Sequence, residues 1–187
     1  MAETQELMEA REEIEAMMAR ARAAQEQIAD YTQEQVDQLI TAMVWAVARE
    51  DRSEEIAQFT VEETQLGNYA GKYLKIHRKT RATLMDIIDD KSVGVIEEDP
   101  ERNIVKIAKP VGVIGALSPS TNPEATPVIK AISAVKGRNA IIVAPHPRAK
   151  LTNKKICDYM REAIVALGGP ADLVQSIDVP SLDKTNE

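Results

Sequence analysis

The chain has 187 residues, enough for one domain of common size or for one domain and part of another. With 44% hydrophobic and 28% charged residues it has the composition of a soluble globular protein, and only 3% aromatic residues predict a core of aliphatic side chains and methionine. No apolar run of about 18 residues is present and the first residues do not resemble a secretory signal, so we expect a cytoplasmic protein without a membrane span.

Charge is distributed unevenly along the chain. Residues 1–60 contain fourteen acidic and five basic side chains, so the remaining residues must sum to +2 to give the overall net charge of −7. The basic share is highest in GKYLKIHRKTR, residues 71–81, which could face nucleic acid or a phosphorylated small molecule. No aromatic platform or nucleic-acid motif accompanies this stretch, so a solvated helix face is the favoured interpretation, and we expect no nucleic-acid partner.

Helical patterns fill residues 1–90, which we expect to form a helical region. The segment 3–29 favours helix but has a narrow apolar stripe, which suits an outer helix packed on the domain or a helix that docks another protein. A second helix follows Thr32 and Gln35, which fit a capping box. Two more are expected, from Ser53 to Leu66 and over residues 68–90.

The pattern changes to strands at Lys91. Residues 91–110 predict a β-hairpin with its turn at Asp99 and Pro100, and Val105 and Ile107 alternate with lysines in its second strand. Two strands alone are marginally stable in water, so this hairpin should pack on another sheet or a second subunit.

Strands and helices alternate in residues 111–187. VGVIGAL, AIIVA and DLVQSI predict buried strands, and the helices between them have Thr126 and Thr152 as expected N-caps. The order βαβαβ predicts a partial Rossmann-like parallel sheet with right-handed crossovers. The predicted fold class is therefore α/β, with N-terminal helices and a β-hairpin followed by this incomplete sheet.

The first predicted strand ends in SPSTN, residues 118–122. Ligands of open parallel sheets bind beyond the carboxyl ends of the strands, and a rigidly held Asn122 amide there can donate to a developing oxyanion. We would then expect this amide to face a cleft and to have no essential structural partner. An ordinary turn is the alternative, because serine, asparagine and proline favour turns for conformational reasons.

The stretch IAKPVGVIGALSPSTNPEATPVIKAISAVKGRNAIIVAPHPRAK strongly resembles the coenzyme-A-acylating branch of the aldehyde dehydrogenase superfamily. KSVGVIEEDPERNIVKIAKP and VEETQLGN look closest to its sulfoacetaldehyde dehydrogenases, and the likeness covers about residues 20–177. The resemblance implies an aldehyde dehydrogenase fold and oxidation of a small aldehyde, sulfoacetaldehyde or acetaldehyde. It also implies NAD or NADP as cofactor, coenzyme A as co-substrate, and a homo-oligomer joined through the hairpin.

The resemblance also assigns residues, with Asn122 as the catalytic side chain that holds the substrate oxygen. The strand-end segment beside the nicotinamide half of the cofactor corresponds to Ser118, Pro119, Ser120 and Thr121. The loop at the adenosine end corresponds to Pro145, His146, Pro147 and Arg148, and the turn near the adenine to Gly169 and Pro170. Ala144 stands about where non-acylating relatives have a lysine. No metal site is expected.

The family reaction needs a cysteine nucleophile. Cys157, the one cysteine here, lies in a predicted helix with nothing nearby to lower its pKa, so we expect it to be structural. The family thiol would lie beyond Glu187. The sequence therefore predicts the amino-terminal part of such an enzyme, with 111–187 as the first part of the NAD(P)-binding domain and 91–110 as an oligomerisation arm. The alternative is an inactive truncated chain that assembles with a full-length subunit.

Overall fold

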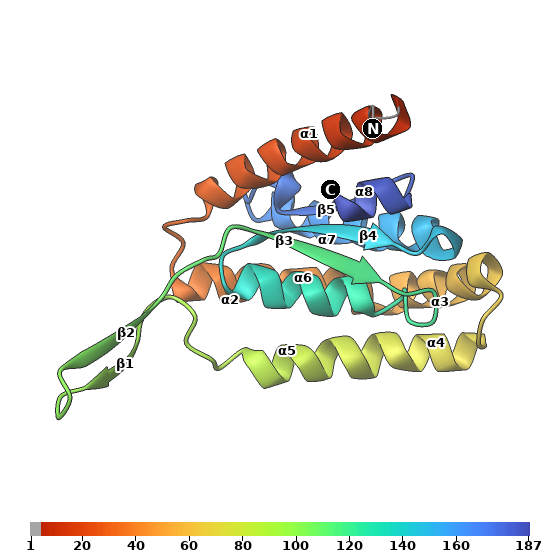
Figure 1. Cartoon of the computed structure of the whole chain (residues 1–187). Coiled ribbons are helices and arrows are strands. Elements are labelled where there is room, and N and C mark those ends of the chain that lie inside the picture. The colour runs from red at the N-terminus through yellow and green to blue at the C-terminus, as the bar shows by residue number, and fades with distance from the viewer. Residues whose placement is uncertain (1–4) are drawn as a thin grey trace.

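The computed structural model describes residues 5–187, which begin with a series of helices (Figure 1). These helices are α1 (Gln5–Gln27), α2 (Gln33–Ala48), α3 (Glu50–Thr64), α4 (Tyr69–Lys75) and α5 (Arg81–Ile87), with a π-helical turn at Ile76–Thr80 joining the last two. The helical region predicted before Lys91 is confirmed, although residues 3 and 4 of the first predicted helix lie outside the described part of the chain. None of the described helices is long and apolar enough to cross a membrane.

The helix ends show which local signals decide the boundaries. Thr32 accepts a hydrogen bond from the backbone N–H of Gln35, and the Gln35 side chain accepts one from the backbone of Thr32, so the predicted capping box is confirmed. Helix α3 begins at Glu50 rather than at Ser53, whose hydroxyl donates to the carbonyl of Glu50. It ends at Thr64, and the C-cap residue Gln65 adopts a left-handed conformation with φ 57°.

The predicted hairpin is confirmed and extends away from the body of the molecule (Figure 1). Strands β1 (Gly94–Asp99) and β2 (Ile104–Ala108) pair antiparallel, with a bulge between Val95 and Glu97. Their side chains are mostly exposed on both faces.

The second sheet is parallel and has the predicted βαβαβ connectivity. It contains β3 (Val113–Ser118), β4 (Ala140–Pro145) and β5 (Val174–Ser176) in the order β3-β4-β5. The connections run through α6 (Thr126–Lys136) and α7 (Lys150–Ala166), and 3-10 turns at Pro147–Ala149 and Ala171–Leu173 precede α7 and β5. A short helix, α8 (Leu182–Asn186), follows the sheet and packs against α1.

The sheet lies between layers of helices (Figure 1). Helix α1 packs across one face, which agrees with its expected role as an outer helix, and α6 and α7 cover the other face with α2 packed beneath them. Side chains from the helices and from the sheet form one continuous buried cluster. Among the described residues β3 has no neighbour on its outer edge, where Leu117 is 63% exposed.

Two of the predicted N-caps are wrong. Thr126 is the first residue of α6 rather than its cap, and its N–H donates to the carbonyl of Asn122. Helix α7 begins at Lys150, so Thr152 lies inside its first turn. The N–H groups of Leu151 and Thr152 lie in the first turn, where a helix offers no carbonyl acceptor, and they donate to the carboxylate of Glu63 at 2.8 Å each. A side chain of α3 therefore caps α7, a contact that local sequence cannot reveal.

Candidate functional site

The predicted cofactor segments meet at the carboxyl edge of the parallel sheet. Ser118 and Pro145 are paired residues at the ends of β3 and β4, and the N–H of His146 donates to the Ser118 carbonyl at 2.9 Å. The segments Ser118–Thr121 and Pro145–Arg148 are thus adjacent, as strand ends of a parallel sheet must be. The hydroxyl of Ser118 is buried and has no hydrogen-bond partner among the described residues.

The loop between β3 and α6 rests on a buried ion pair. The ammonium of Lys72, in α4, donates to the carbonyl of Thr121 at 2.9 Å and to the carboxylate of Glu124 at 3.0 Å. The side chains of Lys72 and Glu124 are 2% and 0% exposed. A buried lysine needs such a partner, because its charge is costly to remove from water.

The basic stretch 71–81 is therefore not simply a solvated face. Its later residues Arg78, Lys79 and Arg81 are exposed, but Lys72 supports the loop. Lys72 precedes the buried Ile76 and Thr80 at intervals of four residues along the helical stretch. That spacing places all three on one face, and it is the sequence signal that could have identified Lys72 as inward-facing.

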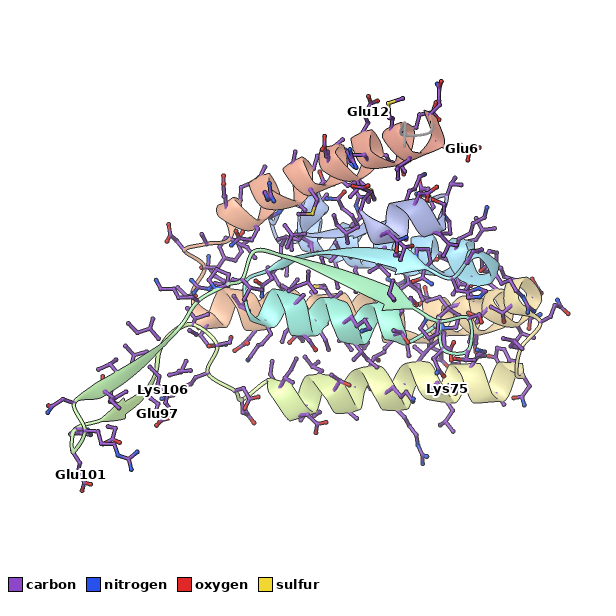
Figure 2. The ribbon with its side chains drawn as sticks, viewed as in Figure 1. Glu6, Glu12, Lys75, Glu97, Glu101 and Lys106 are labelled. Carbon is purple, nitrogen blue, oxygen red and sulfur yellow. The ribbon has the colours of Figure 1, made fainter. Side chains whose placement is uncertain are left out.

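A second lysine of α4 holds the predicted catalytic side chain. The ammonium of Lys75 donates to Oδ1 of Asn122 at 2.8 Å, and Figure 2 shows Lys75 extending from α4 toward the loop after β3. Among residues 5–187 the amide nitrogen of Asn122 donates a hydrogen bond to the Thr121 hydroxyl alone, at 3.4 Å. The expectation that this amide has no essential structural partner thus fits its nitrogen, which makes one long hydrogen bond, better than its oxygen.

The loop after β4 is partly engaged in structural contacts. His146 Nδ1 accepts from the N–H of Arg148 at 3.1 Å and begins the 3-10 turn that includes Pro147. The guanidinium of Arg148 donates to the carbonyl of Thr64 at 2.7 Å and satisfies the end of α3. His146, Pro147 and Arg148 remain exposed at the edge of the site.

Gly169 and Pro170 lie apart from these segments. They follow α7 and precede β5, which places them at the amino end of the strands, opposite the edge where Ser118 lies. A Cβ on Gly169 would lie 2.9 Å from a methyl group of Ile164, and its N–H donates to the Ile164 carbonyl. The pair ends α7, and its contact with the adenine stays a prediction.

Cys157 has the environment of a structural residue. It lies in α7 with 1% of its surface exposed, and burial raises the pKa of its thiol to about 12. The thiol is therefore protonated at neutral pH and is a poor nucleophile. Ser53 is a second buried residue whose side chain could act as a nucleophile, and its hydroxyl lies 3.0 Å from His77 Nε2. The hydroxyl hydrogen, however, is donated to the backbone carbonyl of Glu50. Burial and the nearby charge of Arg81 lower the pKa of His77.

The chain has a parallel sheet with a polar carboxyl edge, preceded by helices and a projecting hairpin, and it belongs to the aldehyde dehydrogenase family. The sequence model of that family matches residues 3–183. The chain is 48% identical over 168 residues to a sulfoacetaldehyde dehydrogenase from Acholeplasma, covering 90% of this chain and 35% of that protein. It is 42% identical to an acetylating succinate-semialdehyde dehydrogenase of Clostridium kluyveri, covering 93% and 38%.

Solved structures of acylating enzymes have the same fold. An acetylating aldehyde dehydrogenase from Geobacillus thermoglucosidasius superposes with a TM-score of 0.89 at 33% identity, covering 98% of this chain and 40% of that one. A propionaldehyde dehydrogenase from Rhodopseudomonas palustris holds bound coenzyme A, and an engineered glycolyl-CoA reductase holds NADP+, with TM-scores of 0.79 and 0.76 at 27% and 26% identity. These two cover 92% of this chain and 39% and 38% of theirs. The predicted fold class and the resemblance to acylating aldehyde dehydrogenases are confirmed.

Proposed function

We propose that this chain is part of a coenzyme-A-acylating aldehyde dehydrogenase that converts a small aldehyde to its acyl-CoA with NAD or NADP. The chain spans 35% to 40% of the length of the relatives described above, so the proposed activity is that of a whole enzyme and not of these residues alone. Sulfoacetaldehyde and acetaldehyde are the proposed substrates, and the 48% identity to a sulfoacetaldehyde dehydrogenase favours the first.

The single observation that carries this proposal is the fixed orientation of Asn122. Its oxygen is held by Lys75 and its nitrogen makes one long contact, so the amide presents a donor at the carboxyl edge of the sheet. In the proposed reaction a cysteine thiolate adds to the aldehyde carbon, and the aldehyde oxygen becomes an oxyanion. The Asn122 N–H group would stabilise that charge until hydride leaves the carbon and the acyl group passes to the thiol of coenzyme A.

The cofactor fits the same edge. NAD or NADP would accept the hydride, and the Ser118–Thr121 and Pro145–Arg148 segments, whose residues Pro119, Thr121 and 146–148 are exposed, would hold it. The two prolines at positions 119 and 123, on either side of residues 120–122, restrict the loop before binding.

The test is a chimaera in which this chain replaces the matching part of the Acholeplasma sulfoacetaldehyde dehydrogenase. Substituting Asn122→Ala should lower kcat by about 100-fold or more, with little change in the KM for the cofactor, because an oxyanion donor acts in the transition state. Ser133→Ala, an exposed change on α6, is the matched control and should leave kcat unaltered. An Asn122→Ala chimaera with undiminished kcat would show that SPSTN is a structural turn.

A further inference from the structure

The contact between Lys75 and Asn122 determines which end of the amide faces outward. An ammonium group carries only hydrogen-bond donors, so at 2.8 Å it can bind the amide oxygen and not the amide nitrogen. An asparagine without such a neighbour could present either its oxygen or its nitrogen to a ligand. Lys75 therefore selects the orientation in which the two N–H donors of Asn122 point away from α4.

The charges around the loop do not cancel. Lys72 and Lys75 share one carboxylate, that of Glu124, which lies 3.0 Å from the first ammonium and 3.8 Å from the second. Lys72 is buried against this carboxylate, whereas Lys75 is 40% exposed. One positive charge thus remains beside the Asn122 oxygen, where it polarises the amide and makes its N–H groups stronger donors.

We propose that Lys75 is a positioning residue for the oxyanion donor: it fixes the orientation of the Asn122 amide and strengthens the hydrogen bond that Asn122 makes to the substrate oxygen. This proposal rests on the proposed role of Asn122. The two lysines have different partners. Lys72 donates to the loop backbone and to the Glu124 carboxylate, whereas Lys75 donates to the Asn122 side chain.

The first experiment uses the 187-residue chain itself. Nuclear magnetic resonance of the asparagine side-chain amides should show the Asn122 signals shifted in Lys75→Met, because the amide loses its fixed partner. Lys79→Met is the matched control, since Lys79 is an exposed lysine in the π-helical turn after α4, and it should leave those signals in place. Unchanged Asn122 signals in folded Lys75→Met would overturn the proposal.

The second experiment measures catalysis in the chimaera. Lys75→Met should lower kcat by about 10- to 100-fold, less than the loss of the donor itself, while the KM for the cofactor stays constant. Lys75→Arg should restore part of the loss, because a guanidinium can also donate to Oδ1. The double variant Lys75→Met/Asn122→Ala should be no slower than Asn122→Ala, because Lys75 acts through Asn122.

The outcomes separate the two proposals. A low kcat for Asn122→Ala with a normal kcat for Lys75→Met would overturn the role of Lys75 and leave that of Asn122 intact. Independent, additive losses in the double variant would also overturn it, because they would mean that Lys75 acts elsewhere. A normal kcat for Asn122→Ala would overturn the proposed role of Asn122, and with it the role of Lys75 that rests on it.

Discussion

At the scale of single residues, Lys72 and Glu124 form a deeply buried ion pair, with side chains that are 2% and 0% exposed. Removing one member of a buried ion pair leaves the other charge without compensation, whereas removing both avoids that cost. Lys72 also donates a hydrogen bond to the Thr121 carbonyl, so the backbone of the SPSTN loop depends on this lysine.

Lys72→Met should therefore lower the free energy of unfolding by at most about 3–5 kcal/mol, because Glu124 keeps only the partly exposed Lys75, 3.8 Å away, as a partner. Urea unfolding of the 187-residue chain, followed by circular dichroism, measures this loss. Lys79→Met should change stability by no more than about 0.5 kcal/mol, because that side chain is exposed. Adding Glu124→Gln to Lys72→Met should recover much of the stability. If Lys72→Met and Lys79→Met unfold alike, the ion pair does not stabilise the loop.

The sequence predicted Asn122 but not the residues that hold it. SPSTN could be recognised locally because small polar residues follow an apolar strand. The contacts of Lys72 and Lys75 with the loop span 47 to 52 positions of the chain, so they depend on how α4 packs beneath it. Composition alone indicated a solvated basic face, and only the four-residue spacing from Lys72 to Ile76 and Thr80 indicated otherwise.

At the scale of elements, the two-residue capping box was a reliable signal, whereas a single threonine before an apolar run was not. The Thr32 capping box is local and was predicted. The cap of α7 is the carboxylate of Glu63, which lies 88 residues before Leu151, so Thr152 was the wrong choice. The same limit applies to β5, which is shorter than the apolar run DLVQSI because Leu173 lies in a 3-10 turn.

The hairpin is the element whose exposure calls for a partner. Val105 and Ile107 alternate on one face of β2 and are each 55% exposed. Val95 pairs with Ile107 from the neighbouring strand and adds to this apolar face. A second copy of the chain could bury it, in line with the subunit-joining hairpin that the family resemblance implies.

We predict that the chain self-associates through this face. Sedimentation should show concentration-dependent association that Val105→Ser with Ile107→Ser weakens, because the exposed apolar area falls. Lys106→Gln is the control on the opposite face, where an exposed ion pair with Glu97 contributes little. A folded wild-type chain that stays monomeric at every concentration would contradict the oligomerisation arm.

At the scale of the whole molecule, the periodicity of residues 111–187 was sufficient to predict the parallel sheet. It could not show that α1, far away in sequence, covers the face opposite α6 and α7. An apolar stripe on a helix indicates that the helix packs against something, but not which element it packs against.

The 187-residue chain alone should not oxidise aldehydes. Its one cysteine is buried with a pKa of about 12, so it supplies no thiolate for addition to the carbonyl carbon. Incubation with sulfoacetaldehyde or acetaldehyde, coenzyme A and NAD or NADP should produce no reduced cofactor. Turnover that disappears in Cys157→Ser would contradict the structural role of Cys157.

Among the described residues the outer edge of β3 is unpaired, and in the proposed enzyme this would bear on where the cofactor binds. Along the chain the strands β3, β4 and β5 step across the sheet in one direction. A further parallel strand joining at β3 would require the chain to return across the sheet and then proceed in the opposite direction. Connections leaving two such neighbouring strands diverge to opposite faces, and a crevice opens between them at this topological switch point. The Ser118–Asn122 loop is the first connection after β3, so it would form one wall of that crevice, and the arriving strand would supply the other.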